Sequence, residues 1–225
     1  MKTTVKRIYQ VEKLFQRGAT SDLLFLTFIW LLAVLIVDPR GNFPLNDDWS
    51  YGTTVKRLCV EGRYHPVGFT SHSLITHVMW GTFFCLFSGF SFEILRFSTI
   101  VISLIGVYSI YLIVRQLGQR RPLALIAALL IAFNPIYFSL SFTFMTDISF
   151  ATFASLSILF FMRSLKFDLE FDFIIGSFLS AAAILCRQNG FFIPIAYAIA
   201  HFKRFGWQGH SVFRATFSMA FGASS

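Results

Sequence analysis

Residues 122–146 read PLALIAALLIAFNPIYFSLSFTFMT and contain no charged side chain. A helix needs about 20 consecutive apolar residues to cross a hydrocarbon core about 30 Å thick. This stretch is therefore long and apolar enough to hold a membrane span. We expect the span over residues 122–138, followed by an uncharged loop that ends at residue 146.

The rest of the chain has the same apolar character. Of its 225 residues, 56% are hydrophobic and 13% are charged, whereas soluble domains are about 25% charged. The chain contains 30 phenylalanines, and a water-soluble fold of this size could not enclose so much apolar surface. The composition excludes a disordered chain and predicts an all-α, polytopic bundle of transmembrane helices.

The intervals between charged residues predict about six to seven spans. We expect them at residues 23–37, 97–114, 122–138, 148–162, 173–186 and 191–200, with the start of a seventh at residue 211. Arg187-Gln188-Asn189-Gly190 lies between the fifth and the sixth, and we interpret it as a polar hairpin that joins two short helices. One long helix is the alternative, but it would place Arg187 in the middle of the membrane, where a charge is costly.

The basic residues predict the orientation of the spans. The formal net charge is +8, and Lys and Arg are enriched in the cytoplasmic loops of membrane proteins. Residues 38–96 then form a long external loop, because five basic residues precede the first span and place the N-terminus in the cytoplasm: Lys2, Lys6, Arg7, Lys13 and Arg17. We expect a multi-pass protein of the plasma (inner) membrane. Its loops account for the basic excess, so we expect no nucleic-acid partner.

Residues 74–90, LITHVMWGTFFCLFSGF, are apolar enough to be a further span. A span here would reverse every later loop and place the basic residues between 115 and 121 outside. We therefore expect a helix that lies in the external interface, with Trp80 and the phenylalanines toward lipid. The polar side chain of His77 agrees with that interpretation.

Two adjacent carboxylates, Asp47 and Asp48, follow the first span closely. Adjacent acids raise each other's pKa values unless a metal ion, a base or a hydrogen-bond donor offsets their repulsion. The pair is a candidate general base or metal site. The alternative is a solvated loop that caps a helix beginning near Trp49. The sequence indicates no specific cofactor, although a divalent metal ion could bind the pair.

Two isolated charges lie at the external ends of later spans. Asp147 is either a functional acid or the N-cap of the helix that begins at Ile148. Arg187 could hold a phosphate through two parallel hydrogen bonds, or it could extend to ordinary lipid headgroups. The histidines and cysteines of the chain are not at the spacing of a zinc site.

The order of these motifs resembles the polytopic GT-C glycosyltransferases. After the first span come residues 47–51 (DDWSY), then residues 62–66 (GRYHP), and then an apolar helix before Arg96 opens the next span. Asn134-Pro135 is similar to the end of the family's third span. Residues 186–190 (CRQNG) are similar to its Lys-Gly or Lys-x-x-Gly turn. The branch that the chain resembles contains the protein O-mannosyltransferases and the bacterial aminoarabinose transferases.

Three departures from the family pattern are visible. Asp48 stands where Glu is common, Arg187 stands where Lys is common, and a single proline follows His65 where many relatives have two. Members of the family are longer chains. We therefore expect residues 1–225 to form the N-terminal part of one GT-C-like membrane domain.

The resemblance implies transfer of a monosaccharide from a polyprenyl-phosphate-linked donor to an external acceptor, which is a lipid, a glycan or a protein. It implies Asp47 as the general base and Asp48 as its neighbour for acceptor or metal contact. The residues that it assigns to substrate binding are Asp147, Arg187, His65 and Tyr51.

Two other classes of protein remain alternatives. A transporter or flippase would carry ionisable residues along its spans, whereas the polar residues of this chain gather toward one side of the predicted bundle. A non-catalytic membrane partner would need no acidic pair at all. Uptake or flipping by the full-length protein without sugar transfer would favour the transporter or flippase. Unchanged glycosylation after Asp47→Asn and Asp48→Asn would favour the non-catalytic partner.

Overall fold

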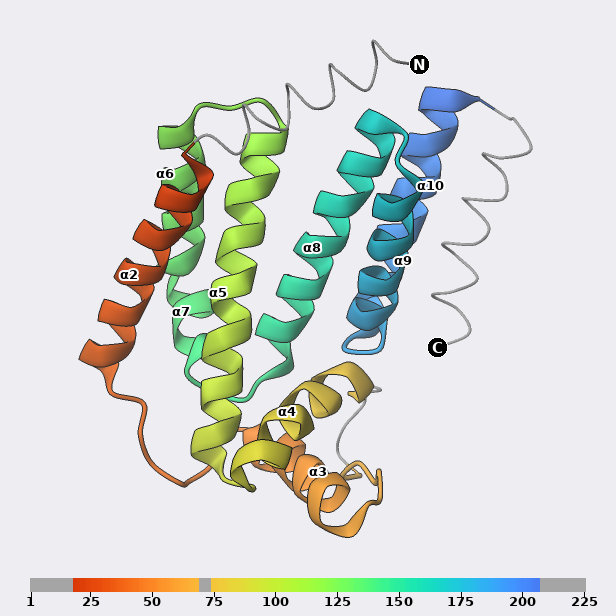
Figure 1. Ribbon diagram of the computed structural model, residues 1–225. Coiled ribbons are helices and arrows are strands. Elements are labelled where there is room, and N and C mark those ends of the chain that lie inside the picture. Colours follow the sequence, from red (N-terminus) through yellow and green to blue (C-terminus); the bar gives the residue numbers. More distant parts are fainter. Residues whose placement is uncertain (1–17, 69–73, 207–225) are drawn as a thin grey trace.

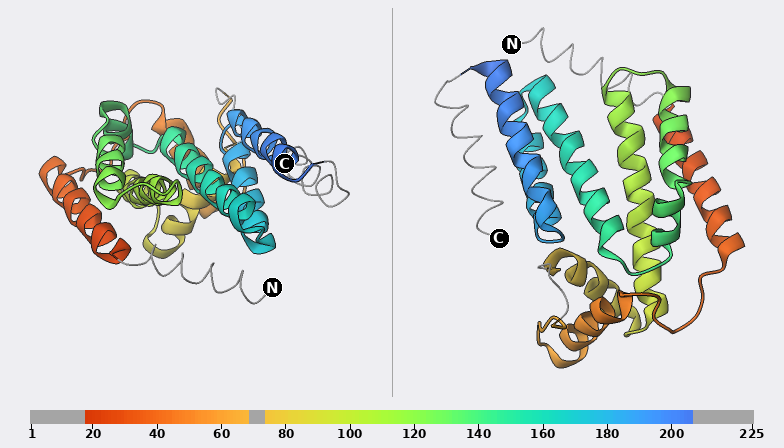
Figure 2. Two further views of the ribbon diagram at one scale, coloured as in Figure 1. Left: turned by 90° about the horizontal axis from the view of Figure 1, so that it is seen from above. Right: turned by 180° about the vertical axis from the view of Figure 1, so that it is seen from behind.

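The computed structural model describes residues 18–68 and 74–206, and these residues fold as helices joined by short connections. The expected seventh span from residue 211 and the basic residues before the first span lie outside the described residues. Within them, three helices are long and apolar enough to cross a membrane: α2 (Ala19–Val37), α5 (Phe92–Gln116) and α8 (Thr146–Phe167). They contain three of the expected spans. Figures 1 and 2 show α5 between the other two.

The expected span over residues 122–138 is broken. Its two parts, α6 (Arg121–Ala132) and α7 (Pro135–Ser141), meet at an angle of 64°. Pro135 has no backbone N–H and disfavours a helical conformation in the residue before it. Asn134 is the N-cap of α7. Its side chain accepts hydrogen bonds from two backbone N–H groups of the first turn at 3.0 and 3.2 Å. Together the bent pair makes a fourth candidate span.

The apolar stretch after α8 folds as the expected hairpin of two short helices. α9 (Glu170–Ile184) and α10 (Phe192–Phe205) are joined through the 3-10 helix η1 (Gln188–Phe191). With 15 and 14 residues, both are shorter than the about 20 residues of a full span, so the count of six or seven crossings stays a prediction. α9 packs against α8 and extends the bundle on the side away from α2 (Figure 2).

Two helices lie across one end of the bundle, which we call the α3 end (Figure 1). α3 (Asp48–Glu61) and α4 (Ile75–Ser88) pack against each other, and α4 also contacts α5 and α8. α4 is too short to cross a membrane, as the charge pattern predicts. The interpretation of His77 is wrong, however, because its side chain is fully buried. Trp80 is half-buried and donates its indole N–H to the Ser98 carbonyl at 2.9 Å, whereas Phe83 and Phe87 are exposed as expected.

Two apolar clusters hold these layers together. In the first, the small side chains of Ala124 and Ala128 let α6 approach α2 and α5 closely, as small residues do between membrane helices. In the second, Val55 of α3, Leu95 of α5 and Phe144 pack together with the start of α4. This second cluster attaches the α3 end to the bundle.

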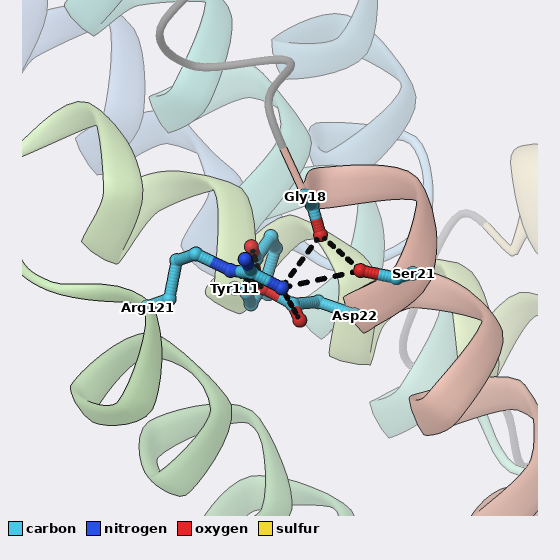
Figure 3. Close-up of polar contacts among 5 residues, drawn as sticks. All are labelled: Gly18, Ser21, Asp22, Tyr111 and Arg121. Atoms are coloured by element: carbon cyan, nitrogen blue, oxygen red, sulfur yellow. Dashed lines mark hydrogen bonds and ion pairs between the residues drawn. The ribbon is translucent and has the colours of Figure 1, made fainter.

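A polar cluster closes the bundle at the opposite end. Asp22 of α2, only 5% exposed, accepts hydrogen bonds from Arg121 of α6 at 2.7 and 2.9 Å and from the hydroxyl of Tyr111 of α5 at 2.6 Å (Figure 3). Arg121 also donates to the carbonyl of Gly18 and to the hydroxyl of Ser21. A buried carboxylate requires such partners because an isolated charge is costly to bury. The cluster therefore fixes three helices relative to one another.

Candidate active site

An ion pair joins the start of α8 to the turn after α9. The Nη1 and Nη2 atoms of Arg187 lie 2.8 and 2.9 Å from the two carboxylate oxygens of Asp147, and its Nε–H donates to the hydroxyl of Thr146 at 2.9 Å. A guanidinium binds a carboxylate or a phosphate in this two-pronged geometry. The side chains of Arg187 and Asp147 are 25% and 35% exposed, so a ligand at the α3 end can reach the pair.

The turn after α9 is built so that Arg187 faces α8. The N–H of Gly190 donates to the Arg187 carbonyl at 2.9 Å. A Cβ atom at residue 190 would lie only 2.6 Å from the backbone nitrogen of Ile184. Glycine is therefore required for this close approach. Cys186 is buried beside the turn, with its thiol 3.5 Å from the carbonyl of Thr146.

Asp147 is not the N-cap of α8. The helix begins at Thr146 and its cap position is Met145, so Asp147 lies within the first turn. A carboxylate in the first turn still interacts favourably with the positive end of the helix dipole. Its oxygens, however, are bonded to Arg187.

Asp48 is fully buried and is held by the backbone. Its carboxylate accepts the N–H of Leu45 at 2.5 Å and the N–H of Phe144 at 3.5 Å. Burial raises the pKa of the Asp48 carboxyl, and these two hydrogen bonds act in the opposite direction. Asp48 therefore connects the start of α3 to the segment before α8.

Asp47 is exposed and occupies the N-cap position of α3, but its side chain makes no capping hydrogen bond. The capping alternative for the side chain is therefore wrong. One turn later, burial raises the pKa of the Tyr51 hydroxyl, with Asp47 and Asp147 acting in the same direction and Arg187 against them. These effects reach Tyr51 from three parts of the chain. Asp47, Tyr51, Asp147 and Arg187 thus share one electrostatic neighbourhood, which we call the acidic cluster.

His65 and Arg96 are both involved in hydrogen bonds to backbone carbonyls outside the acidic cluster. His65 is exposed after α3, and its backbone carbonyl accepts a hydrogen bond from Arg57 at 3.0 Å, while its substrate-binding role stays a prediction. The sequence interpretation used Arg96 only to mark the start of a span. In the structure its side chain is 2% exposed. It holds the connection between α2 and α3 by donating to three carbonyls, those of Pro39, Gly41 and Phe43.

The segment before α8 was missed by reasoning from the sequence. Phe144 acts through its backbone N–H, which Asp48 accepts, and Thr146 acts through a hydroxyl that Arg187 reaches. Neither residue belongs to a polar motif. The available signal was the uncharged loop at residues 139–146, which ends directly before Asp147.

A cavity of about 450 Å³ lies between α2 and α5, with Arg40, Glu93 and Arg96 in its lining. It shares no residue with the acidic cluster, so we place the candidate site by its side chains and not by this cavity. Among the described residues, no three His, Cys, Asp or Glu side chains gather closely enough to hold a metal ion.

Comparison with known proteins identifies the family. A family model described as dolichyl-phosphate-mannose-protein mannosyltransferase matches residues 71–218. The chain belongs to this family. No curated protein and no solved structure gave a match.

Membership makes the chain a multi-pass membrane protein of a glycosyltransferase family that uses a lipid-linked sugar donor. The matched residues include Asp147 and Arg187, together with α4 and all later described helices. Asp47 and Asp48 precede them. The roles of these two acids therefore depend on the geometry of the α3 end and on the resemblance of their motif.

The raised pKa of Asp48 predicts a pH-dependent stability. An acid whose pKa is higher in the folded state stabilises the fold at low pH, and this contribution is lost as the pH rises through the folded-state pKa. We expect the Tm of the wild type minus that of Asp48→Asn to fall by a few degrees between pH 4 and pH 7. Thermal unfolding of both proteins in detergent measures it. A difference that grows with pH would contradict the assignment.

Proposed function

We propose that the chain transfers a monosaccharide from a polyprenyl-phosphate-linked donor to an acceptor hydroxyl at the α3 end, on the external side of the plasma (inner) membrane. One observation carries the proposal. Asp48 binds the backbone N–H of Phe144, which places the exposed Asp47 at the start of α3 next to the segment that leads into the Asp147–Arg187 pair. The family match supports a donor of this chemical class.

Asp47 is the general base in this mechanism. It is exposed and its side chain makes no capping bond, so the carboxylate can accept the proton of an acceptor hydroxyl. The acceptor oxygen forms a bond to the anomeric carbon while the bond from that carbon to the phosphate oxygen breaks. The electron pair of the broken bond leaves with the polyprenyl phosphate. In-line attack inverts the anomeric configuration.

Arg187 binds the phosphate and stabilises its charge as it leaves. Its guanidinium makes two parallel bonds to Asp147, and a phosphate presents the same arrangement of oxygens. Asp147 therefore holds Arg187 in the orientation that the donor requires. The donor phosphate exchanges with the carboxylate or shares the guanidinium with it.

Asp48 has a positioning role in this proposal. Both of its partners are backbone N–H groups, and the side chain is fully buried. It cannot contact the acceptor without breaking those bonds. Its position next to Asp47 means that it sets where the first turn of α3 lies, and with it the direction of the catalytic carboxylate.

Asp47→Asn is expected to lower the rate of sugar transfer by about 10²- to 10⁴-fold, the range for loss of a general base. Transfer of label from radiolabelled polyprenyl-phosphate mannose into membranes that contain the native acceptors measures it. Asp38→Asn is the matched control, because Asp38 is an exposed aspartate at the same end that pairs with Arg40. Equal activity of Asp47→Asn and wild type would rule out Asp47 as the base.

Arg187→Gln is expected to lower kcat/KM for the same donor by about 10²-fold, because one electrostatic donor to the leaving group is lost. Arg187→Lys should recover part of the loss, since lysine keeps the charge but not the two-pronged geometry. Arg40→Gln serves as the control at the same end of the molecule. If Arg187→Gln has the kcat/KM of the wild type, Arg187 does not bind the phosphate.

The orientation of the protein is testable by labelling. Asn46 and Asn189 are exposed near the acidic cluster, and Arg120 is exposed at the opposite end. In a chain without its native cysteines, we expect a membrane-impermeant maleimide to label Asn46→Cys and Asn189→Cys in intact cells. Arg120→Cys should react only after the membrane is permeabilised. The reverse pattern would place the acidic cluster in the cytoplasm and remove the external reaction.

A further inference from the structure

We propose that His77 is a positioning residue for sugar transfer, and that it acts by fixing the backbone of Phe144 between the Asp47–Asp48 pair and the arginine that binds the donor. The inference rests on the proposed function and adds a residue to it. His77 belongs to α4, a helix that contributes no residue to the acidic cluster.

The hydrogen bonds of His77 define its tautomer. Its Nε2 lies 3.3 Å from the carbonyl oxygen of Phe144, and its Nδ1 lies 2.8 Å from the hydroxyl oxygen of Ser149 in α8. A carbonyl oxygen can only accept, so Nε2 carries the hydrogen and Nδ1 accepts the hydroxyl hydrogen of Ser149. Burial lowers the pKa of His77 to about 4, which keeps this neutral tautomer at neutral pH.

Phe144 is held from two sides. Its carbonyl accepts from His77 and its N–H donates to Asp48. Its ring stacks on the imidazole with centroids 4.0 Å apart. The ring also touches α4 at Gly81, where a Cβ would lie 2.6 Å from it. These contacts use both backbone polar groups of Phe144 and bury its side chain completely.

The position of Phe144 determines the geometry of the acidic cluster. Asp48, the neighbour of the proposed base Asp47, is bonded to its N–H. Three residues later the chain reaches Asp147, which binds Arg187. Without His77, the Phe144 carbonyl and the Ser149 hydroxyl would both lose a buried partner, and the segment would shift. A displacement of about 1 Å can cost about 10²-fold in rate.

His77 is fully buried, so it acts through Phe144 and not on the substrate. His77→Leu removes both hydrogen bonds. His77→Gln can replace them, because its amide carries a donor and an acceptor. Ser149→Ala removes the Nδ1 bond alone. His201→Leu is the matched control, since His201 is a buried histidine in the second half of α10, a helix that ends at the opposite end of the bundle (Figure 1).

Kinetics with radiolabelled polyprenyl-phosphate mannose test the proposal on folded protein in native-acceptor membranes. We expect His77→Leu to lower kcat at least about tenfold with less than about a threefold change in the donor KM. Arg187 keeps its own bonds to Thr146 and Asp147, whereas Asp48 is bonded directly to Phe144. His77→Gln should recover most of kcat, and His201→Leu should keep it. Wild-type kcat in His77→Leu, or equal losses in His77→Leu and His201→Leu, would overturn the positioning role.

A double mutant separates this route from general destabilisation. His77→Leu and Asp48→Asn both act through Phe144. The double variant should therefore keep a higher kcat than is expected if the fractional losses of the two single variants multiplied. His201→Leu combined with Asp48→Asn should give effects that multiply. Multiplicative effects in both pairs would contradict coupling through Phe144.

A spectroscopic measurement does not depend on activity. In the ¹⁵N-histidine NMR spectrum of the detergent-solubilised chain, we expect an Nε2–H tautomer signal that His77→Gln removes and Ser149→Ala shifts at Nδ1. If the wild type transfers no sugar but this signal is present, the proposed function fails while the His77 geometry holds. If the signal shows the Nδ1–H tautomer, the positioning role of His77 fails whatever the activity.

Discussion

The structure depends on placing an arginine at the boundary of an apolar bundle without leaving its charge unpaired. A guanidinium in or near hydrocarbon requires a partner, and Asp147 supplies one with two parallel contacts to Arg187. The pair connects the turn after α9 to the first turn of α8. Because each member is partly exposed at the α3 end, the interaction that stabilises the junction also prepares a guanidinium of fixed orientation for an anion.

The second constraint is that α3 and α4 must be attached to the bundle without a membrane span between them. The attachment is made by apolar packing around Phe144 and Leu95 and by hydrogen bonds to backbone groups. Arg96 holds the carbonyls of the connection that leads into α3. Asp48 holds N–H groups on both sides of the junction. These bonds pair backbone N–H and C=O groups that lie outside the helices and have no helical partner. The loops at this end are therefore held in place and can position side chains.

The sequence predicted the parts of this fold that depend on local composition. Charge-free intervals located α2, α5 and α8. The short length of α4 agrees with the prediction from the charge balance that it lies in the interface, and that prediction stays untested. The bend at Asn134 was not predicted from the hydrophobic pattern, because that pattern continues through it, although the family resemblance placed the end of a span at Asn134-Pro135. Asp147 and Arg187 were each recognised, but their pairing is a tertiary contact between residues 40 positions apart that no local pattern encodes. His77 was assigned to an interface because a polar residue on an apolar helix has the same sequence signature whether it faces headgroups or a buried partner.

The family match covers only one part of the acidic cluster. Residues 71–218 contain the arginine–carboxylate pair and the histidine, whereas Asp47 and Asp48 lie before the matched region. The position of the acidic pair is nevertheless determined by matched residues, since Phe144 donates to Asp48 and Arg96 binds the connection before α3. The later helices therefore form the fixed part of the cluster, to which the segment between α2 and α4 is fitted. Under the proposed function, changes in that segment that preserve the contacts to Phe144 and Arg96 would alter which acceptor approaches Asp47 and leave the donor side unchanged.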